Sequence, residues 1–193
     1  MRLPPIAPDD LTDAQRPLFD AMTAGVSAKF GGFTTTRADG ALLGPWNAWL
    51  HDPEVGAAFW TVTQALTKAQ RIPDPARQVA ILVTGAHFGA AFELYAHGAV
   101  AKQKDGMRDR RIATLAAGER PEDLDDQEAA AFDVAKALLK GGPLPAALYD
   151  QAVALFGQAG ANELIWLVGH YCFVSLTLNG FDVPVPTSDP AAG

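Results

Sequence analysis

The sequence predicts an all-α fold, a single-domain helical bundle of about eight or nine helices. Three observations favour it. The 193 residues suit one compact domain, and 49% hydrophobic with 19% charged residues is a globular composition. Apolar residues recur at helical spacing through most of the chain. No run with β alternation extends beyond a few residues.

The first half of the chain shows clear helix starts. The prolines of the N-terminal arm end near Pro8, and Asp10 or Thr12 can cap a helix that runs to about residue 24. The segment 25–45 carries five glycines without a clear period, which indicates a long ordered loop. A short helical turn at 46–52 follows. Asp52-Pro53-Glu54 then opens a helix to about residue 70, because proline and an acid suit a first turn.

The second half repeats these signals. Asp74-Pro75 opens the next helix, and Gly85 and Gly89 indicate a bend or break before the chain becomes helical again. The remaining helices are expected at 90–104, 108–117, 129–140, 145–156 and 162–179. The last is apolar on nearly every face, so either this chain or a partner subunit should surround it.

Composition excludes several classes of function. The net charge of −7 repels phosphate backbones, so nucleic acid is not an expected partner. The single cysteine, Cys172, excludes an internal disulfide, a Cys-x-x-Cys pair and a cysteine-rich zinc site. The N-terminus lacks a signal-peptide core and the apolar run 164–178 is short for a membrane span. A cytoplasmic protein without a membrane partner is therefore expected.

The strongest candidate for chemistry is the pair Glu93 and His97. Four residues apart on a helix, they share one face, where a carboxylate can orient an imidazole for proton transfer. The same spacing suits two ligands of a divalent metal, with His87 as the nearest third donor. A surface ion pair and a buried structural pair are the alternatives without function. The apolar and small residues around the pair favour a functional site.

The order of several motifs resembles the carboxymuconolactone decarboxylase family, which shares its fold with alkylhydroperoxidase D. The matching segments are Arg77-Gln78-Val79-Ala80-Ile81-Leu82, Phe92-Glu93-Leu94-Tyr95-Ala96-His97, Gly44-Pro45-Trp46-Asn47, Glu163-Leu164-Ile165 and Asn179-Gly180-Phe181. The resemblance covers a core at 43–181, which leaves an arm and helix at 1–42 in the same 1–193 domain. It implies a homo-oligomer: a dimer, trimer or hexamer.

The chain departs from the family at chemically important positions. The hydroperoxidase branch has a Cys-x-x-Cys-x-x-x-His pattern, whose cysteine positions here are Ala90 and Glu93. Without these thiols, thiol peroxidase chemistry is not expected, and a peroxidase assignment would rest on fold alone. The family commonly has a glutamate where this chain has Gln78, whose amide cannot accept a proton as a carboxylate does.

The resemblance therefore implies a cofactor-independent lyase, a decarboxylase that acts on a small carboxylated lactone or related metabolite. In this hypothesis His97 donates the proton and Glu93 orients the His97 ring. The residues expected to bind substrate are His87, Gln78, Arg77 and Tyr95. Among them His87 is a possible second donor, and Arg77 is either the carboxylate anchor or a solvated helix residue. The alternative is a small-molecule binding or assembly protein that kept the fold without catalysis.

Overall fold

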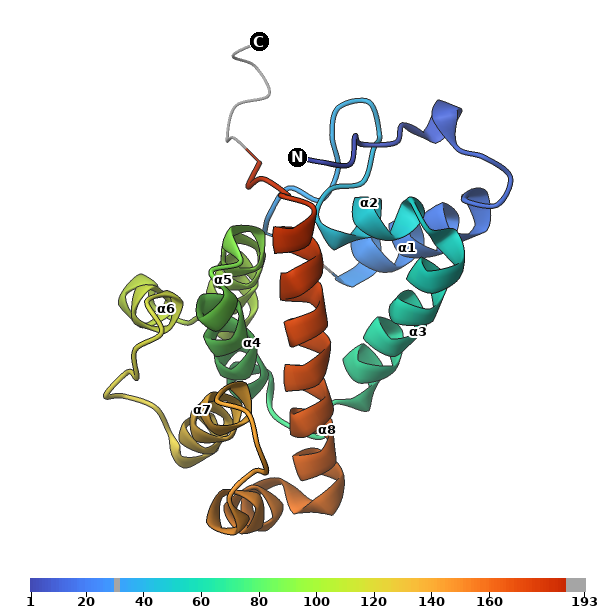
Figure 1. Ribbon diagram of the computed structural model, residues 1–193. Coiled ribbons are helices and arrows are strands. Elements are labelled where there is room, and N and C mark those ends of the chain that lie inside the picture. The colour runs from blue at the N-terminus through green and yellow to red at the C-terminus, as the bar shows by residue number, and fades with distance from the viewer. Residues whose placement is uncertain (30–31, 187–193) are drawn as a thin grey trace.

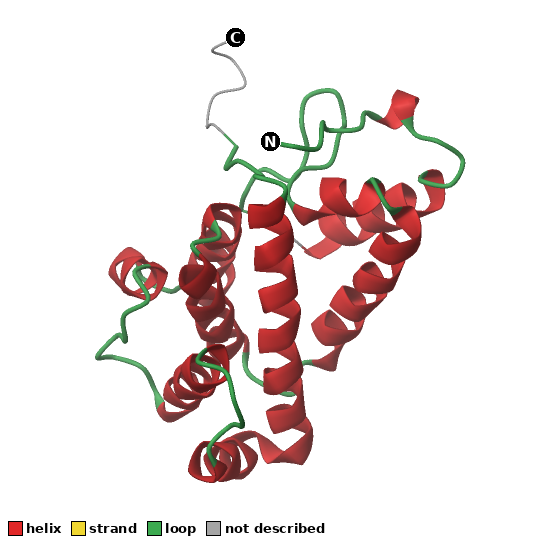
Figure 2. Cartoon of the chain, viewed as in Figure 1, coloured by secondary structure: helices red, strands yellow, loops and turns green. Residues whose placement is uncertain are grey.

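The computed structural model describes residues 1–29 and 32–186, and within them the prediction of an all-α fold is confirmed (Figure 2). Among these residues, β pairing is limited to one isolated bridge between Thr36 and Leu42. The elements are a 3-10 turn at Pro8–Asp10 and the helices α1 Arg16–Lys29, α2 Pro45–Leu50, α3 Pro53–Ala69, α4 Asp74–Phe88, α5 Ala91–Asp105, α6 Asp109–Ala116, α7 Asp126–Leu139 and α8 Ala146–Gly180.

Helix α8 runs through the middle of the molecule (Figure 1). On one side it packs with α4 and α7 around a hydrophobic cluster that includes Leu82, Phe132 and Leu164. On the other side α1, α2 and α3 enclose a second cluster, which is rich in tryptophan and includes Trp46, Trp49 and Trp60. Residues of α5 and α8 contribute to both clusters, so these two helices join the halves of the molecule.

The helix boundaries follow most of the start signals. Helix α1 begins at Arg16, later than predicted, because Pro17 suits only a first turn and Thr12 instead pairs with Gln15 in the preceding turn. It also reaches Lys29, inside the predicted loop; residues 30–31 of that loop lie outside the described residues. The expected break between the last two helices is a single residue, Gly157, with φ 69° and ψ 170°.

Helix α8 is long and apolar enough to cross a membrane by length and composition, with a mean hydropathy of 1.2 over its most apolar window. This test is weak evidence, because a core helix passes it as readily as a membrane span. The packing of α8 against α2, α3, α4, α5 and α7 suits a core helix. The expectation that no membrane is involved stays a prediction.

Candidate functional site

Glu93 and His97 form a buried pair on α5. His97 Nε2 lies 3.1 Å from Glu93 Oε1, one helical turn away. His97 is 7% exposed and Glu93 is 3% exposed. The alternative of a surface ion pair is therefore wrong for these residues, whereas a buried pair with a structural or a chemical role remains. Burying a carboxylate and an imidazole away from water costs free energy unless each of their polar atoms has a hydrogen-bond partner.

Gln78, on the neighbouring helix α4, completes the surroundings of the ring. Its Oε1 lies 2.8 Å from His97 Nδ1. Each ring nitrogen of His97 thus has an oxygen within hydrogen-bond distance, an arrangement that suits an imidazole with a proton on both nitrogens. The edge of Tyr171 packs on the same ring at 5.0 Å between centroids and an interplanar angle of 87°. Burial, followed by the nearby Glu93 charge, raises the pKa of the Tyr171 hydroxyl, which favours its neutral form.

His97 and Tyr171 form a wall between two cavities. The larger cavity, about 240 Å³, is polar and is lined by residues of α3, α4, α5 and α8 together with Gln70. The smaller cavity, about 40 Å³, is mainly aromatic and is also lined by Glu93. The residues that line the polar cavity include Arg77, Gln78, Asp74 and Asp105. Those that line the aromatic cavity include Phe33, Trp46, Trp49, Phe92, Thr63 and His170.

Two glycines allow the aromatic cavity to form. Gly44, before α2, has φ 66°, and a Cβ there would lie 2.5 Å from the Phe92 ring. Gly56 of α3 faces the backbone of α2, where a Cβ would lie 2.3 Å from the carbonyl oxygen of Trp49. Because neither position carries a side chain, α2 packs closely on α3, and the Phe92 ring of α5 reaches the backbone just before α2. This close packing places Trp49 and Phe92 beside the Glu93–His97 pair.

His170 adds a second imidazole to the aromatic cavity. Its Nε2 lies 3.2 Å from Thr63 Oγ1 of α3. Burial, together with the charge of His97, lowers the pKa of His170 to about 4. The ring is therefore neutral near pH 7 and can exchange only a hydrogen bond with Thr63 or a ligand.

Arg77 lies in the polar cavity but is already paired. Its guanidinium forms an ion pair with Glu163, which is fully buried on α8, and Nη2 donates to the Leu66 carbonyl at 3.1 Å. The Arg77 side chain is 11% exposed, so the interpretation of a solvated residue is wrong. Since Glu163 compensates its charge, Arg77 is a weaker anchor for a substrate carboxylate than the sequence indicated.

The polar cavity is lined by two carboxylates, Asp74 and Asp105, and also by the cations of Lys104 and Arg77. Burial, followed by repulsion from Asp74, raises the pKa of Asp105. One oxygen of Asp105, Oδ2, is buried without a hydrogen-bond partner in the described part of the chain. Charges of both signs therefore line the polar cavity close to Gln78 and His97, which suits water or a polar group and favours neither sign of charge.

Two residues expected to bind substrate lie elsewhere. His87 is exposed near the end of α4, packs edge-on against Phe88 and lines neither cavity. Tyr95 faces the N-terminal loop, where its hydroxyl accepts a hydrogen bond from the Thr34 amide at 3.0 Å. Within residues 1–29 and 32–186 no three His, Cys, Asp or Glu side chains are placed to hold a metal ion, so the set of His87, Glu93 and His97 does not assemble.

Cys172 lies on α8 and lines neither of the two cavities. Burial raises the pKa of its thiol, which disfavours the reactive thiolate. The position therefore suits a small apolar core residue, as the sequence indicated, rather than a nucleophile.

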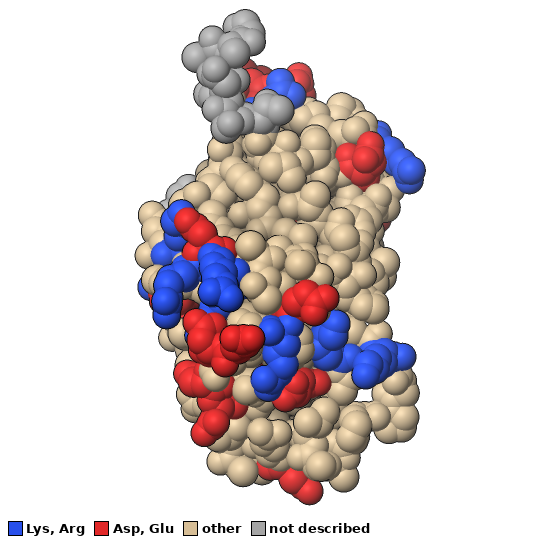
Figure 3. Space-filling model, turned by 90° about the vertical axis from the view of Figure 1, so that its left-hand side faces the viewer, with Lys and Arg blue, Asp and Glu red and all other residues tan. Residues whose placement is uncertain are grey.

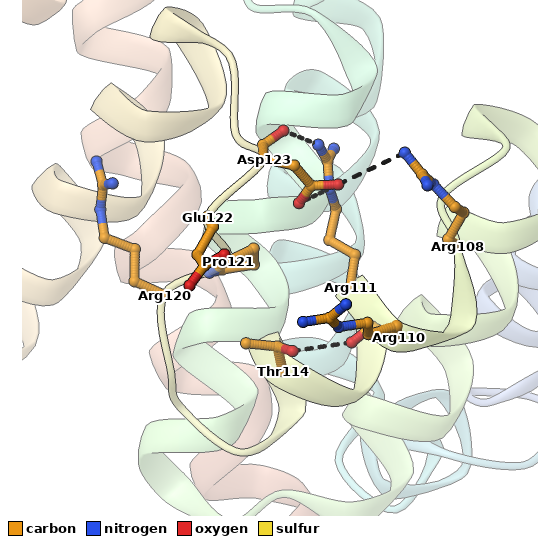
Figure 4. A pocket seen from close by; sticks show the side chains of 8 residues that line it. All are labelled: Arg108, Arg110, Arg111, Thr114, Arg120, Pro121, Glu122 and Asp123. Carbon is orange, nitrogen blue, oxygen red and sulfur yellow. Dashed lines mark hydrogen bonds and ion pairs between the residues drawn. The ribbon is translucent and has the colours of Figure 1, made fainter.

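A third hollow lies on the surface around α6 and has about 370 Å³ (Figure 4). Arg108 and Arg111 both pair with Asp123 in it, and Arg111 also pairs with Glu128. Charges of both signs are mixed on this side of the molecule (Figure 3). Because Arg108 and Arg111 are compensated by carboxylates and no histidine is among the described lining residues, the hollow is a weaker candidate site than the His97 cavities.

Sequence reasoning missed several residues that the fold brings to the site. They are Trp49, Thr63, Glu163, His170 and Tyr171. His170 and Tyr171 were visible as polar residues on an apolar helix, which is the usual signal of a satisfied core residue. No local pattern connects them with His97, because they meet it only through the packing of α8 on α5.

No protein-family model matches the chain, and no curated protein matches it either. Solved structures do. A cysteine-to-alanine variant of the debrominase Bmp8 in complex with 2,3,4-tribromopyrrole is 15% identical with a TM-score of 0.71, over 97% of this chain and 92% of the debrominase. The apo debrominase is similar at 14% identity and a TM-score of 0.70, over 96% and 92%.

A protein of unknown function from Agrobacterium tumefaciens, described as an antioxidant defence protein of the AhpD type, is 17% identical with a TM-score of 0.66. The alignment covers 74% of this chain and 97% of that protein. At these identities the similarities show the fold alone. The chain has an AhpD-like fold, as the sequence predicted, whereas membership of the carboxymuconolactone decarboxylase family is not confirmed.

Proposed function

We propose that this protein is an enzyme in which His97 donates a proton to a small ring-shaped metabolite in the aromatic cavity. One observation carries the proposal: a buried imidazole with an oxygen at each nitrogen lines a cavity of otherwise mainly aromatic side chains. General acid catalysis needs a held proton that can reach the ligand, so donation from His97 requires Nε2–H to leave its contact with Glu93. In support, the similar debrominase has been seen with tribromopyrrole, a small flat ring.

The substrate class that we propose is a carboxylated lactone, and the reaction is decarboxylation. The bond between the ring carbon and the carboxylate breaks and CO₂ leaves. The electron pair of that bond stays on the ring and spreads onto the lactone carbonyl. His97 then protonates a ring carbon and recovers its proton from solvent, so the net change is replacement of CO₂ by H⁺. No cofactor is needed for this step, because the carbonyl of the substrate takes up the charge.

The character of the aromatic cavity supports this reaction. Among the side chains that the structure describes, no Lys or Arg lines it, and Glu93 contributes a carboxylate. A localised carboxylate is poorly stabilised in such surroundings, whereas the delocalised charge that follows loss of CO₂ is disfavoured less. Glu93 also holds the His97 ring in place through its contact with Nε2.

The test is CO₂ release from a set of unsaturated carboxylated lactones. His97→Gln keeps polar atoms near Gln78 and Glu93 but cannot donate a proton as an imidazole does, so we expect turnover to fall by about 10²- to 10⁴-fold. His51→Gln is the matched control, because His51 Nε2 contacts only the Pro4 carbonyl, far along the chain from α5. Equal turnover in both variants would refute His97 as the acid.

A second candidate is a binding or assembly protein without catalysis. Gln78 favours it, since an amide stands beside His97 where a carboxylate could have shared a proton. In that case the wild-type protein would bind lactones and release no CO₂, and His97→Gln would change affinity alone. A thiol peroxidase is disfavoured, because the chain has no cysteine pair.

We also propose a homo-oligomer in the cytoplasm, with the exposed apolar face of α3 and α8 as the contact between copies. Its large exposed side chains are Val55, Val62, Trp166 and Leu176, which are 44% to 60% exposed. An apolar face of this kind is typical of a protein interface. Sedimentation at several concentrations tests it, and Trp166→Glu is expected to shift the protein toward the monomer.

A further inference from the structure

Trp49 presents an unusual feature on the wall of the aromatic cavity. It lies on α2 and is 5% exposed, yet its indole Nε1 is buried without a hydrogen-bond partner in the described residues. An unpaired buried N–H costs free energy, and buried indoles usually find an acceptor. The same side chain lines the aromatic cavity together with Glu93 and His97. Because Nε1 itself is closed off from solvent, a small shift of the ring or its neighbours is needed before a ligand in the cavity can supply the missing acceptor.

Other buried polar atoms without a partner do not share this position. In the described part of the chain they belong to Thr23, Trp60, Asp105 and Ser175, and none of these side chains lines the aromatic cavity. Trp60 is the closest comparison, since it is also 5% exposed and belongs to the same hydrophobic cluster. Its ring packs against Gly25 of α1, where a Cβ would lie 2.5 Å from Cζ2.

The surroundings select the kind of acceptor. An indole N–H only donates, so the ligand must supply an oxygen or similar acceptor. The Glu93 carboxylate lines the cavity, and no Lys or Arg among the described side chains does, which disfavours an anionic oxygen. A cavity of about 40 Å³ has roughly three times the 10–15 Å³ that one water needs, which suits a small ring.

We infer that Trp49 Nε1–H donates a hydrogen bond to the neutral carbonyl oxygen of a small ring ligand in the aromatic cavity. Trp49 is thus a specificity-determining residue that distinguishes a lactone or cyclic ketone from the same ring without a carbonyl. In decarboxylation the same N–H faces the oxygen on which negative charge develops. The inference deepens the proposed function and rests on it for the choice of site.

The test compares two ligands that differ by one carbonyl, γ-butyrolactone and tetrahydrofuran. Titration of each into ¹⁵N-labelled protein is followed through the indole N–H signals of the four tryptophans, which Trp49→Phe and Trp60→Phe assign. We expect γ-butyrolactone to move the Trp49 signal downfield in a saturable way and tetrahydrofuran to move it much less. The Trp60 signal should respond to neither ligand, because Trp60 does not line the cavity.

Affinity gives the second readout. The preference of the wild-type protein for γ-butyrolactone over tetrahydrofuran should fall about tenfold or less in Trp49→Phe, which is what one hydrogen bond contributes. The smaller ring of phenylalanine changes the affinity for both ligands alike, so the ratio of the two affinities reports the contribution of the indole N–H alone. In Trp60→Phe, the matched control, the ratio should not change.

A Trp49 signal that responds equally to both ligands, or a preference that survives in Trp49→Phe, would overturn the inference. The proposed function fails separately. If the Trp49 signal responds as expected while His97→Gln retains full turnover of lactones, the binding role of Trp49 stands and the role of His97 as the acid falls.

Discussion

The buried imidazole of His170 makes the stability of the protein depend on pH in a defined window. In the unfolded chain a histidine takes up a proton below about pH 6.5, whereas folded His170 does so only below about pH 4. Between these values the unfolded state binds more protons, so the free energy of unfolding falls as the pH falls. The difference between 6.5 and about 4 corresponds to about 3 kcal/mol, lost by pH 4 and fully retained above pH 6.5.

His170→Asn isolates this contribution from the carboxylates that titrate at low pH. The asparagine can still bond to Thr63 but takes up no proton. Urea unfolding of both proteins, followed by tryptophan fluorescence from pH 7 to pH 4, gives the difference in free energy of unfolding at each pH. We expect the advantage of the wild type over the variant to shrink by about 3 kcal/mol across this range. A difference that stays constant would refute a buried, neutral His170.

Three further substitutions test how the site is held. Gly56→Ala places a Cβ against the Trp49 carbonyl and should cost about 2 kcal/mol in urea unfolding; an unchanged stability would mean that α2 and α3 do not pack so closely. Glu163→Ala leaves Arg77 without its buried partner and should cost about 3 kcal/mol, measured in the same way, whereas a neutral effect would contradict the ion pair. Cys172→Ser should leave lactone turnover unchanged, and a loss of turnover in a folded variant would reveal a role for the thiol.

The fold was largely predictable because the signals that start and end its helices lie in short stretches of sequence. Proline and acidic residues at Asp52-Pro53 and Asp74-Pro75 fix the starts of α3 and α4 within a residue or so. The start of α1 was predicted too early, since Asp10 and Thr12 look like caps although the chain there forms a 3-10 turn and a separate turn at Gln15. Helical spacing also placed Glu93 beside His97 correctly.

The rest of the site depends on packing between distant segments. Thr63 and His170 are 107 residues apart in sequence, and Arg77 and Glu163 are 86 apart, so no spacing rule connects them. The unpaired indole of Trp49 becomes visible only when α2 is packed on α3 and α8. His87 illustrates the opposite case, because proximity in sequence suggested a shared site whereas the turn at Gly89 leaves it exposed.

The most direct measurement is a crystal structure of the protein with 5-oxotetrahydrofuran-2-carboxylate, a small carboxylated lactone. The proposal predicts the ring in the aromatic cavity, with a ring carbon facing His97 and the lactone carbonyl oxygen within hydrogen-bond distance of Trp49 Nε1. A ligand bound only in the polar cavity beside Arg77, or only in the surface hollow around α6, would contradict it. Binding only around α6 would leave His97 as a structural residue that holds α4 and α5 together through Gln78, whereas binding in the polar cavity would still lie beside His97 and would overturn the roles of the aromatic cavity and Trp49.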